Sequence, residues 1–246
     1  MNITNKTVLI TGGGSGIGLE TAKLLSEKGN KVIIIGRNES KLQAAAKILP
    51  NTIAIRCDIT NQNDITDLIA NVNLNYPELS ILINNAGHAF AYKHDQNARA
   101  FEKAEEEFAT NYFAVIRLTE NLLPVLKLQE NAAIVNVTSI VAFSPSAALP
   151  SYSDSKTALH SYTLSLRHTL SKNTAIKVFE LMPPLVDTEF SKEMGGENGM
   201  RASDVAQGLI SGMTNDTYEI QVGQTAEFRK LYLLSPNDAF EMMNQN

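Results

Sequence analysis

The sequence has few of the features that would place it in several common protein classes. It contains one cysteine, Cys57, in 246 residues, so an internal disulfide cannot form and a disulfide-stapled secreted fold is excluded. No apolar run approaches the roughly 18 residues that a membrane helix needs. Basic residues are also few: 21 Lys and Arg stand against 26 Asp and Glu, for a formal net charge of −5, whereas a general nucleic-acid binder needs a basic face. The N-terminus has a single basic residue before a glycine cluster and does not match a signal peptide. We therefore expect a cytoplasmic protein that neither binds nucleic acid nor inserts into a membrane.

What is present is an alternation of short apolar runs with longer stretches of helical pattern. Most runs are continuous and rich in β-branched residues, which is typical of strands covered on both faces. Strands that alternate with helices pair in parallel through right-handed crossovers. The sequence therefore predicts an α/β protein with a single-domain Rossmann fold over residues 1–246: a doubly wound parallel seven-stranded sheet with helices on both faces. The predicted strands are Val8–Thr11, Val32–Ile35, Ile53–Arg56, Ile81–Asn84, Ala133–Val137, Lys177–Leu181 and Glu219–Val222.

Single residues predict where some helices begin and end. Gly29 stands where a glycine commonly follows the C-terminus of a helix. Thr60 is expected to cap a helix over Asn61–Asn73, and Ser203 to cap a helix over Asp204–Met213.

A glycine-rich loop, Thr11–Gly18, follows the first predicted strand and opens the first helix. Gly12 allows a sharp turn, Gly16 allows the backbone to approach a phosphate, and Gly18 brings the helix close to the sheet, so that free N–H groups point at the anion. The spacing is wider than the standard dinucleotide fingerprint, and a glycine-rich loop alone is weak evidence. The strand–loop–helix context favours phosphate binding, with a methyltransferase as a competing interpretation.

The end of the second predicted strand indicates which nucleotide is bound. A site for NAD places an acid about 20 residues after the loop, to hold the ribose 2′-hydroxyl. Here Gly36 stands at that position and Arg37 follows it, which leaves room for a 2′-phosphate and offers it a charge-assisted fork. This predicts NADP(H), against the alternative that Arg37 is a solvated turn residue. Asp58, after the third strand, is placed to accept from an adenine amino group, although spacing alone favours a turn aspartate before Ile59.

Tyr152 and Lys156 lie four residues apart in a predicted helix and so share one face. A free tyrosine titrates near pH ~10, and acid–base work at neutral pH asks for a fall of about three units, or ~4 kcal/mol. A cation about 4 Å away contributes ~4 kcal/mol at an effective dielectric constant near 20. Such a pair is common and usually inert, but Ser139 stands 13 residues upstream, just past a predicted strand whose carboxyl end faces the ligand crevice.

Taken together, these motifs make the chain resemble the short-chain dehydrogenase/reductase family over nearly its whole length. The matching residues are Thr11–Gly18, Asp58, Asn84–Gly87, Asn111, Ser139, Tyr152 and Lys156, in the family's order and approximate spacing. The resemblance implies Tyr152 as proton donor or acceptor, Lys156 as the residue that lowers its pKa and holds the nicotinamide ribose, and Ser139 as the group that stabilises the substrate oxygen. It implies that Asn111 binds a water through its backbone at a helix kink and so connects Lys156 to solvent. It also implies NADP(H) as cofactor, bound by Gly12, Gly14, Ser15, Gly16, Ile17, Gly18, Arg37, Asp58, Ile59, Asn84, Ala86, Gly87, Tyr152, Lys156, Pro183, Val186 and Thr188.

One loop departs from the family pattern. The family usually has Pro-Gly after the sixth strand, whereas this chain has Pro183-Pro184, and the second proline removes an N–H and fixes φ. Val186 and Thr188 still match positions that meet the nicotinamide carboxamide. The double proline, the C-terminal region and Ala158–Ser161 are similar to the DltE-like oxidoreductase branch of the family.

Two segments are expected to surround the substrate. Residues 190–200, here the lid, carry three glycines and two methionines. They are expected to cover a compact or apolar substrate, with an ordinary surface loop as the equal alternative. Residues 224–246, here the tail, are rich in apolar side chains and are expected to dock on the domain or on a partner subunit. The resemblance implies a homodimer or homotetramer. The four histidines show no metal-ligand spacing, so no metal site is predicted.

The sequence therefore predicts an NADP(H)-dependent oxidoreductase that transfers a hydride between the nicotinamide and a small-molecule carbonyl or alcohol substrate, with Tyr152 as general acid/base. The alternative is a non-catalytic NADP-binding module with a redox-sensing or interaction role. Such a module is expected to have lost residues of the set Asn111, Ser139, Tyr152 and Lys156. All four are present in this sequence.

Overall fold

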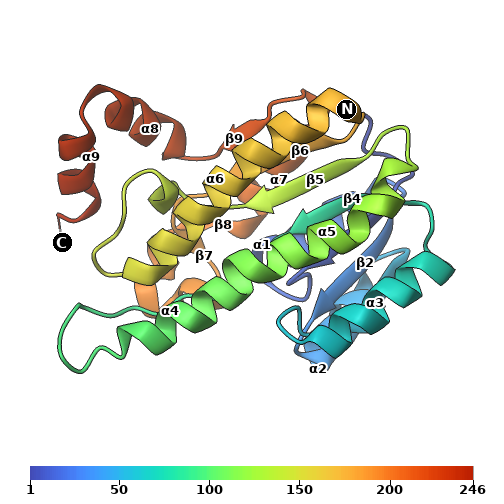
Figure 1. Cartoon of the computed structure of the whole chain (residues 1–246), viewed down its shortest axis with the longest axis horizontal. Coiled ribbons are helices and arrows are strands. Elements are labelled where there is room, and N and C mark those ends of the chain that lie inside the picture. The colour runs from blue at the N-terminus through green and yellow to red at the C-terminus, as the bar shows by residue number, and fades with distance from the viewer. Residues whose placement is uncertain (246) are drawn as a thin grey trace.

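The continuous apolar runs form one parallel sheet in the computed structural model, which describes residues 1–245 (Figure 1). The strand order is β3-β2-β1-β4-β5-β6-β9, and every neighbouring pair is parallel. The predicted seven-stranded, doubly wound Rossmann fold is therefore confirmed. The strands are β1 (Thr7–Thr11), β2 (Lys31–Gly36), β3 (Thr52–Arg56), β4 (Leu79–Asn84), β5 (Ala133–Val137), β6 (Lys177–Met182) and β9 (Glu219–Gln221).

Helices cover both faces of this sheet because the strands bury apolar side chains on both sides. In β1, Val8 and Ile10 face one layer and Leu9 faces the other. The first layer consists of α1 (Gly16–Glu27), α2 (Glu39–Ile48) and α7 (Ala202–Thr214). The second consists of α3 (Gln62–Asn75), α5 (Ala114–Lys127) and α6 (Pro150–Asn173), which lie in front of the sheet in Figure 1.

The shorter elements gather around the carboxyl ends of the strands. The helix α4 (Ala100–Phe108) continues through a π-helical turn, η1 (Ala109–Phe113), into α5, and η2 (Ile140–Ala142) follows β5. The lid region contains β7 (Val186–Asp187), η3 (Glu189–Met194), η4 (Gly196–Asn198) and β8 (Met200–Arg201), with β7 and β8 paired in parallel. The tail forms α8 (Thr225–Leu234) and α9 (Pro236–Met243).

Two of the predicted helix starts are wrong. Asn61, not Thr60, caps α3, accepting from the backbone N–H groups of Asn63 at 2.9 Å and Asp64 at 3.2 Å. The Thr60 hydroxyl instead donates to Asp58, so it is not free to cap the helix. The helix α7 begins at Ala202, before Ser203, and no side chain caps it.

The predicted end of α1 is confirmed, since Gly29 follows the C-cap with φ of +79°. Within residues 1–245, none of the helices has the length and apolar character needed to cross a membrane.

The tail packs against its own chain. Phe228 is buried in a cluster with Ile140 and Val141, and Leu231 and Tyr232 pack on the same cluster. The predicted docking of the tail on its own domain is therefore observed, although Leu234 remains 86% exposed.

Candidate active site

A cavity of about 1200 Å³ opens above the carboxyl ends of the strands. In a doubly wound sheet, ligands bind at this edge, where the strand order reverses; here the reversal falls between β1 and β4. Most of the predicted site residues line this cavity: Gly12, Gly14, Ser15, Gly16, Ile17, Arg37, Asp58, Ile59, Ala86, Gly87, Ser139, Tyr152, Lys156, Pro183, Val186 and Thr188. Gly18, Asn84 and Asn111 are not part of the lining.

The glycine loop forms one end of the cavity. Gly16 has φ of +53°, a left-handed conformation that favours glycine, and a β-carbon there would lie 3.1 Å from Cγ2 of Thr188. A β-carbon on Gly18 would lie 2.4 Å from the carbonyl oxygen of Gly12, so only glycine lets the first turn of α1 pack on the loop. The N-terminus of α1 thus opens directly onto the cavity, a cradle that fits a phosphate group.

Two predicted residues support the cavity wall from behind. Asn84 is buried and its amide donates to Oδ1 of Asn136 at 2.9 Å. Asn111 is fully buried in η1, where its Oδ1 accepts from the His88 N–H and its Nδ2 donates to the His88 carbonyl, both at 2.8 Å. The helix irregularity that the resemblance implies at Asn111 is therefore present as a π-helical turn, a feature common at functional sites.

Lys156 is held at the end of β5. Its Nζ donates to the carbonyl oxygen of Val137 at 2.8 Å and lies 5.6 Å from the centre of the Tyr152 ring. The side chain is buried, and burial lowers the pKa of its ammonium to about 8. The face shared by Tyr152 and Lys156 on α6 therefore points toward the strand end and the cavity, as their spacing predicts.

The Tyr152 phenol has a raised pKa in the structure. Burial is the largest cause, the hydrogen bond with Ser139 acts in the opposite direction, and the Glu107 carboxylate raises the pKa further. The pKa is therefore raised, whereas the family resemblance implies that it is lowered, because desolvation of the phenol outweighs the interaction with Ser139.

Ser139 lies immediately past β5 with an extended backbone. Its Oγ accepts from the backbone N–H of Val141 at 3.3 Å, and its interaction with the Tyr152 phenol lowers the pKa of that phenol. The hydroxyl thus stands beside the phenol, at the position from which it would contact a substrate oxygen bound there.

A buried carboxylate, that of Glu180, bonds to the residue before Ser139 and was not predicted from the sequence. Glu180 of β6 is fully buried, accepts from the Thr138 hydroxyl at 2.7 Å and lies 2.9 Å from Nδ1 of His160. His160 is thus the partner of this acid. No sequence signal links them, since the pairing depends on α6 packing over β6.

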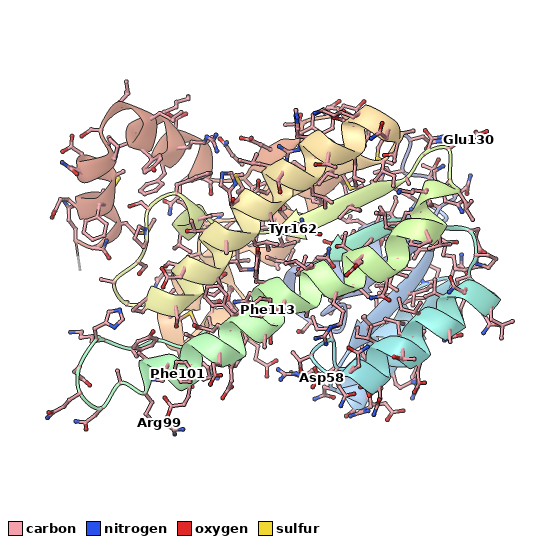
Figure 2. The ribbon with its side chains drawn as sticks, viewed as in Figure 1. Asp58, Arg99, Phe101, Phe113, Glu130 and Tyr162 are labelled. Atoms are coloured by element: carbon pink, nitrogen blue, oxygen red, sulfur yellow. The ribbon has the colours of Figure 1, made fainter. Side chains whose placement is uncertain are left out.

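Charged residues lie at the glycine-loop end of the cavity. Arg37 and Lys41 both line it, and Lys41 forms an ion pair with Glu189 of η3. Lys41 was not predicted as a lining residue. Its position in the first turn of the helix after Arg37 is the sequence feature that indicates it. Asp58 also lines the cavity (Figure 2), but its Oδ1 accepts from the backbone N–H and the hydroxyl of Thr60 at 3.0 and 2.8 Å, the turn role that spacing alone favours.

The double proline sits between β6 and β7. The Pro183 carbonyl accepts from the N–H of Ile140 at 2.9 Å, and Pro183, Pro184, Val186 and Thr188 all line the cavity. The loop therefore still lines the cavity, although Pro184 replaces the glycine of the family's Pro-Gly pattern.

Residues 6–198 match the family model described as short chain dehydrogenase, and the chain accordingly belongs to the short-chain dehydrogenase/reductase family of oxidoreductases. It is 36% identical over 249 residues to the uncharacterized oxidoreductase DltE of Bacillus subtilis (strain 168), covering 99% of this chain and 98% of that protein. The resemblance to the DltE-like branch is thus confirmed.

Solved structures support the fold. A short chain dehydrogenase from Burkholderia cenocepacia J2315 in complex with NADP has a TM-score of 0.86 and 24% identity, covering 98% of each chain. A short chain dehydrogenase/reductase from Burkholderia phymatum in complex with NAD also has a TM-score of 0.86, with 20% identity, covering 99% of this chain and 97% of that one.

Proposed function

We propose that this chain is an NADP(H)-dependent oxidoreductase that interconverts a carbonyl and an alcohol, with Tyr152 as general acid/base. The observation that carries the proposal is the placement of Ser139, Tyr152 and Lys156 on one cavity with the glycine cradle and Arg37. A non-catalytic module has no need of this convergence, and neither does a methyltransferase.

The cavity fits a dinucleotide along its length. The free N–H groups of α1 would hold the pyrophosphate, Asp58 and Ile59 would border the adenine, and Lys156 would hold the nicotinamide ribose. Ala86, Gly87, Pro183, Val186 and Thr188 would border the nicotinamide. When bound, this cofactor supplies the hydride and, in its oxidised form, a positive charge.

The proton is handled by the residues of the chain. In the reductive direction the Tyr152 phenol donates its proton to the substrate oxygen, while the Ser139 hydroxyl donates a hydrogen bond to that oxygen and holds it. The high pKa of the phenol keeps it protonated and ready to donate. In the oxidative direction, the Lys156 ammonium stabilises the phenolate. Asn111, in the π-helical turn, would bind a water that connects Lys156 to solvent.

The preference for NADP(H) is supported by the charges at the glycine-loop end of the cavity. Gly36 has no side chain to repel a 2′-phosphate, and Arg37 and Lys41 both line this end. Relatives of this fold are described in complex with NADP and with NAD, which supports a nicotinamide cofactor in either form.

We further propose that residues 1–246 act as one dinucleotide-binding and catalytic domain in the cytoplasm, as a homodimer or homotetramer. The α4–η1 stretch exposes Phe101 (72%) and Phe113 (56%) (Figure 2), and an exposed apolar face of this kind suits a subunit contact. The lid and the tail would close over the substrate.

The test is a panel of small carbonyl compounds, with NADPH consumption followed by absorbance. Turnover of at least one member at a rate above the cofactor's background oxidation supports the enzyme. NADPH binding without turnover of any member would favour the non-catalytic module instead.

A further inference from the structure

The tail is fixed to the cavity wall rather than lying free on the surface. Asn244, at the end of α9, accepts from the backbone N–H of Ala147 at 2.7 Å and donates to the carbonyl oxygen of Pro145 at 3.1 Å. Tyr232 of α8 stacks on Phe143, with ring centres 6.2 Å apart and an interplanar angle of 29°. The tail therefore holds the loop that leads into α6 and, with it, one side of the cavity.

The surface that this wall presents next to Tyr152 is apolar. The Tyr152 ring packs with the cluster that contains Phe228, Leu231 and Met243, and the Phe190 ring of the lid lies 6.1 Å from the Tyr152 ring. Phe190, Phe228, Leu231, Met242 and Met243 all line the cavity. A substrate oxygen at Tyr152 thus places the rest of the molecule among aromatic rings and thioethers, which adapt to apolar shapes.

The charges on this wall are all of one sign. The charged lining residues that the lid region and the tail contribute are Glu189, Glu193 and Glu227. The lining cations of the described chain are Arg37 and Lys41 at the glycine-loop end, together with Lys156, which the proposed nicotinamide ribose would occupy.

The two basic residues of α8 pair with acidic side chains of the chain and do not line the cavity. Arg229 lies over the Phe143 ring at 4.6 Å and its NH2 group is 3.2 Å from the Glu219 carboxylate. Lys230 pairs with Glu227 at 2.6 Å. Neither residue belongs to the lining, so a carboxylate or phosphate in this half of the cavity would lose hydration without gaining a cation.

We infer that the lid and tail make this a site for uncharged, apolar carbonyl or alcohol compounds and that they disfavour carboxylate and phosphate substrates. This inference rests on the proposed function, because it assigns a substrate class to the same cavity. Its physical basis is the desolvation of an anion in apolar surroundings, which acts on binding whether or not turnover follows.

The test compares two matched pairs, each a methyl ester and the corresponding carboxylate: methyl para-acetylbenzoate against para-acetylbenzoate, and methyl para-formylbenzoate against para-formylbenzoate. Each is assayed for NADPH consumption and, independently, for a shift in melting temperature of the NADPH-saturated protein. We expect kcat/KM for the esters to exceed that for the acids at least about tenfold, or about 1.4 kcal/mol, because a charge that leaves water without a partner is disfavoured.

A pair of variants checks that the tail sets this preference. Met242 is 56% exposed and lines the cavity, whereas Leu234 is 86% exposed on the same tail and does not line it. Met242→Lys should raise the acid-to-ester ratio of kcat/KM about fivefold, the scale of a partly exposed ion pair. The control Leu234→Lys should leave the ratio unchanged.

The outcomes separate this inference from the proposed function. Equal or better use of the acids, an unchanged ratio in Met242→Lys, or no melting-temperature shift with either ester would overturn the inference. Ester binding without turnover, with no binding of the acids, would support the substrate class while contradicting the proposed activity.

Discussion

The Nζ of Lys156 donates to the carbonyl oxygen of Val137 at 2.8 Å, so an ammonium is buried at the end of strand β5. One hydrogen bond to a carbonyl does not replace the water that such a charge loses. The lowered pKa, about 8, follows from this imbalance.

This burial predicts a pH dependence of stability. The ordinary pKa of the Lys156 side chain is 10.5 and the folded value is about 8, so the unfolded chain holds more protons between these values and stability rises with pH across that window. Between pH 7 and pH 9.5 the contribution of Lys156 to the free energy of unfolding should increase by about 2 kcal/mol. Urea unfolding of the wild type and of Lys156→Met at both pH values checks this. The wild-type value should rise relative to the variant, and a constant difference would contradict the buried charge.

The cofactor preference is expected to depend on Arg37. Arg37→Ala should weaken NADPH binding about 10- to 100-fold, because a hydrogen bond between charged groups contributes about 1.5–3 kcal/mol. NADH binding should change little. A fluorescence titration with each dinucleotide measures this, and Lys47→Ala is the control, since Lys47 is an exposed residue of the same region that does not line the cavity. Equal affinity of the wild type for NADPH and NADH would contradict the role of Arg37 in cofactor preference.

Closing the glycine cradle should weaken cofactor binding. In Gly18→Ala the new β-carbon would meet the Gly12 carbonyl oxygen at 2.4 Å, so the loop and the start of α1 must move apart. We expect affinity for NADPH to fall at least about tenfold and the protein to lose about 1–3 kcal/mol of stability, as in other overpacked sites. Calorimetric titration and urea unfolding report the two effects. Unchanged values for both would show that this close approach does not shape the loop.

The buried acid Glu180 should contribute to stability through its two partners. Glu180→Leu leaves the Thr138 hydroxyl and the His160 ring without their acceptor, and should lower the free energy of unfolding by about 2–4 kcal/mol. Glu180→Gln, which keeps the shape and an acceptor oxygen, should cost less. If the two variants unfold at the same urea concentration, the hydrogen bonds do not account for the stabilisation.

Much of the fold followed from local sequence pattern. The run Val32–Ile35 lies inside β2 and Ala133–Val137 coincides with β5, because apolar β-branched runs bounded by polar turns leave little choice of structure. Helix starts were harder: at α3, Asp58, Thr60 and Asn61 all offer capping side chains, and the choice among them depends on hydrogen bonds that only the folded turn defines.

The site residues could be predicted where residue type and spacing in the sequence define a shared helix face. They could not be predicted where their properties depend on packing between distant segments. Tyr152 and Lys156 share a helix face whatever surrounds them. The pKa of Tyr152, the pairing of Glu180 with His160 and the wall built by the tail depend on segments far apart in the chain that meet only after folding.

Turnover by Tyr152→Phe, measured together with its affinity for NADPH, tests most directly whether Tyr152 is the general acid/base. Removing the phenolic hydroxyl takes away the proton donor and leaves the ring, so kcat should fall about 10²- to 10⁴-fold while the Kd for NADPH changes less than about threefold. A variant that keeps wild-type turnover would contradict the assignment of Tyr152 as the general acid/base.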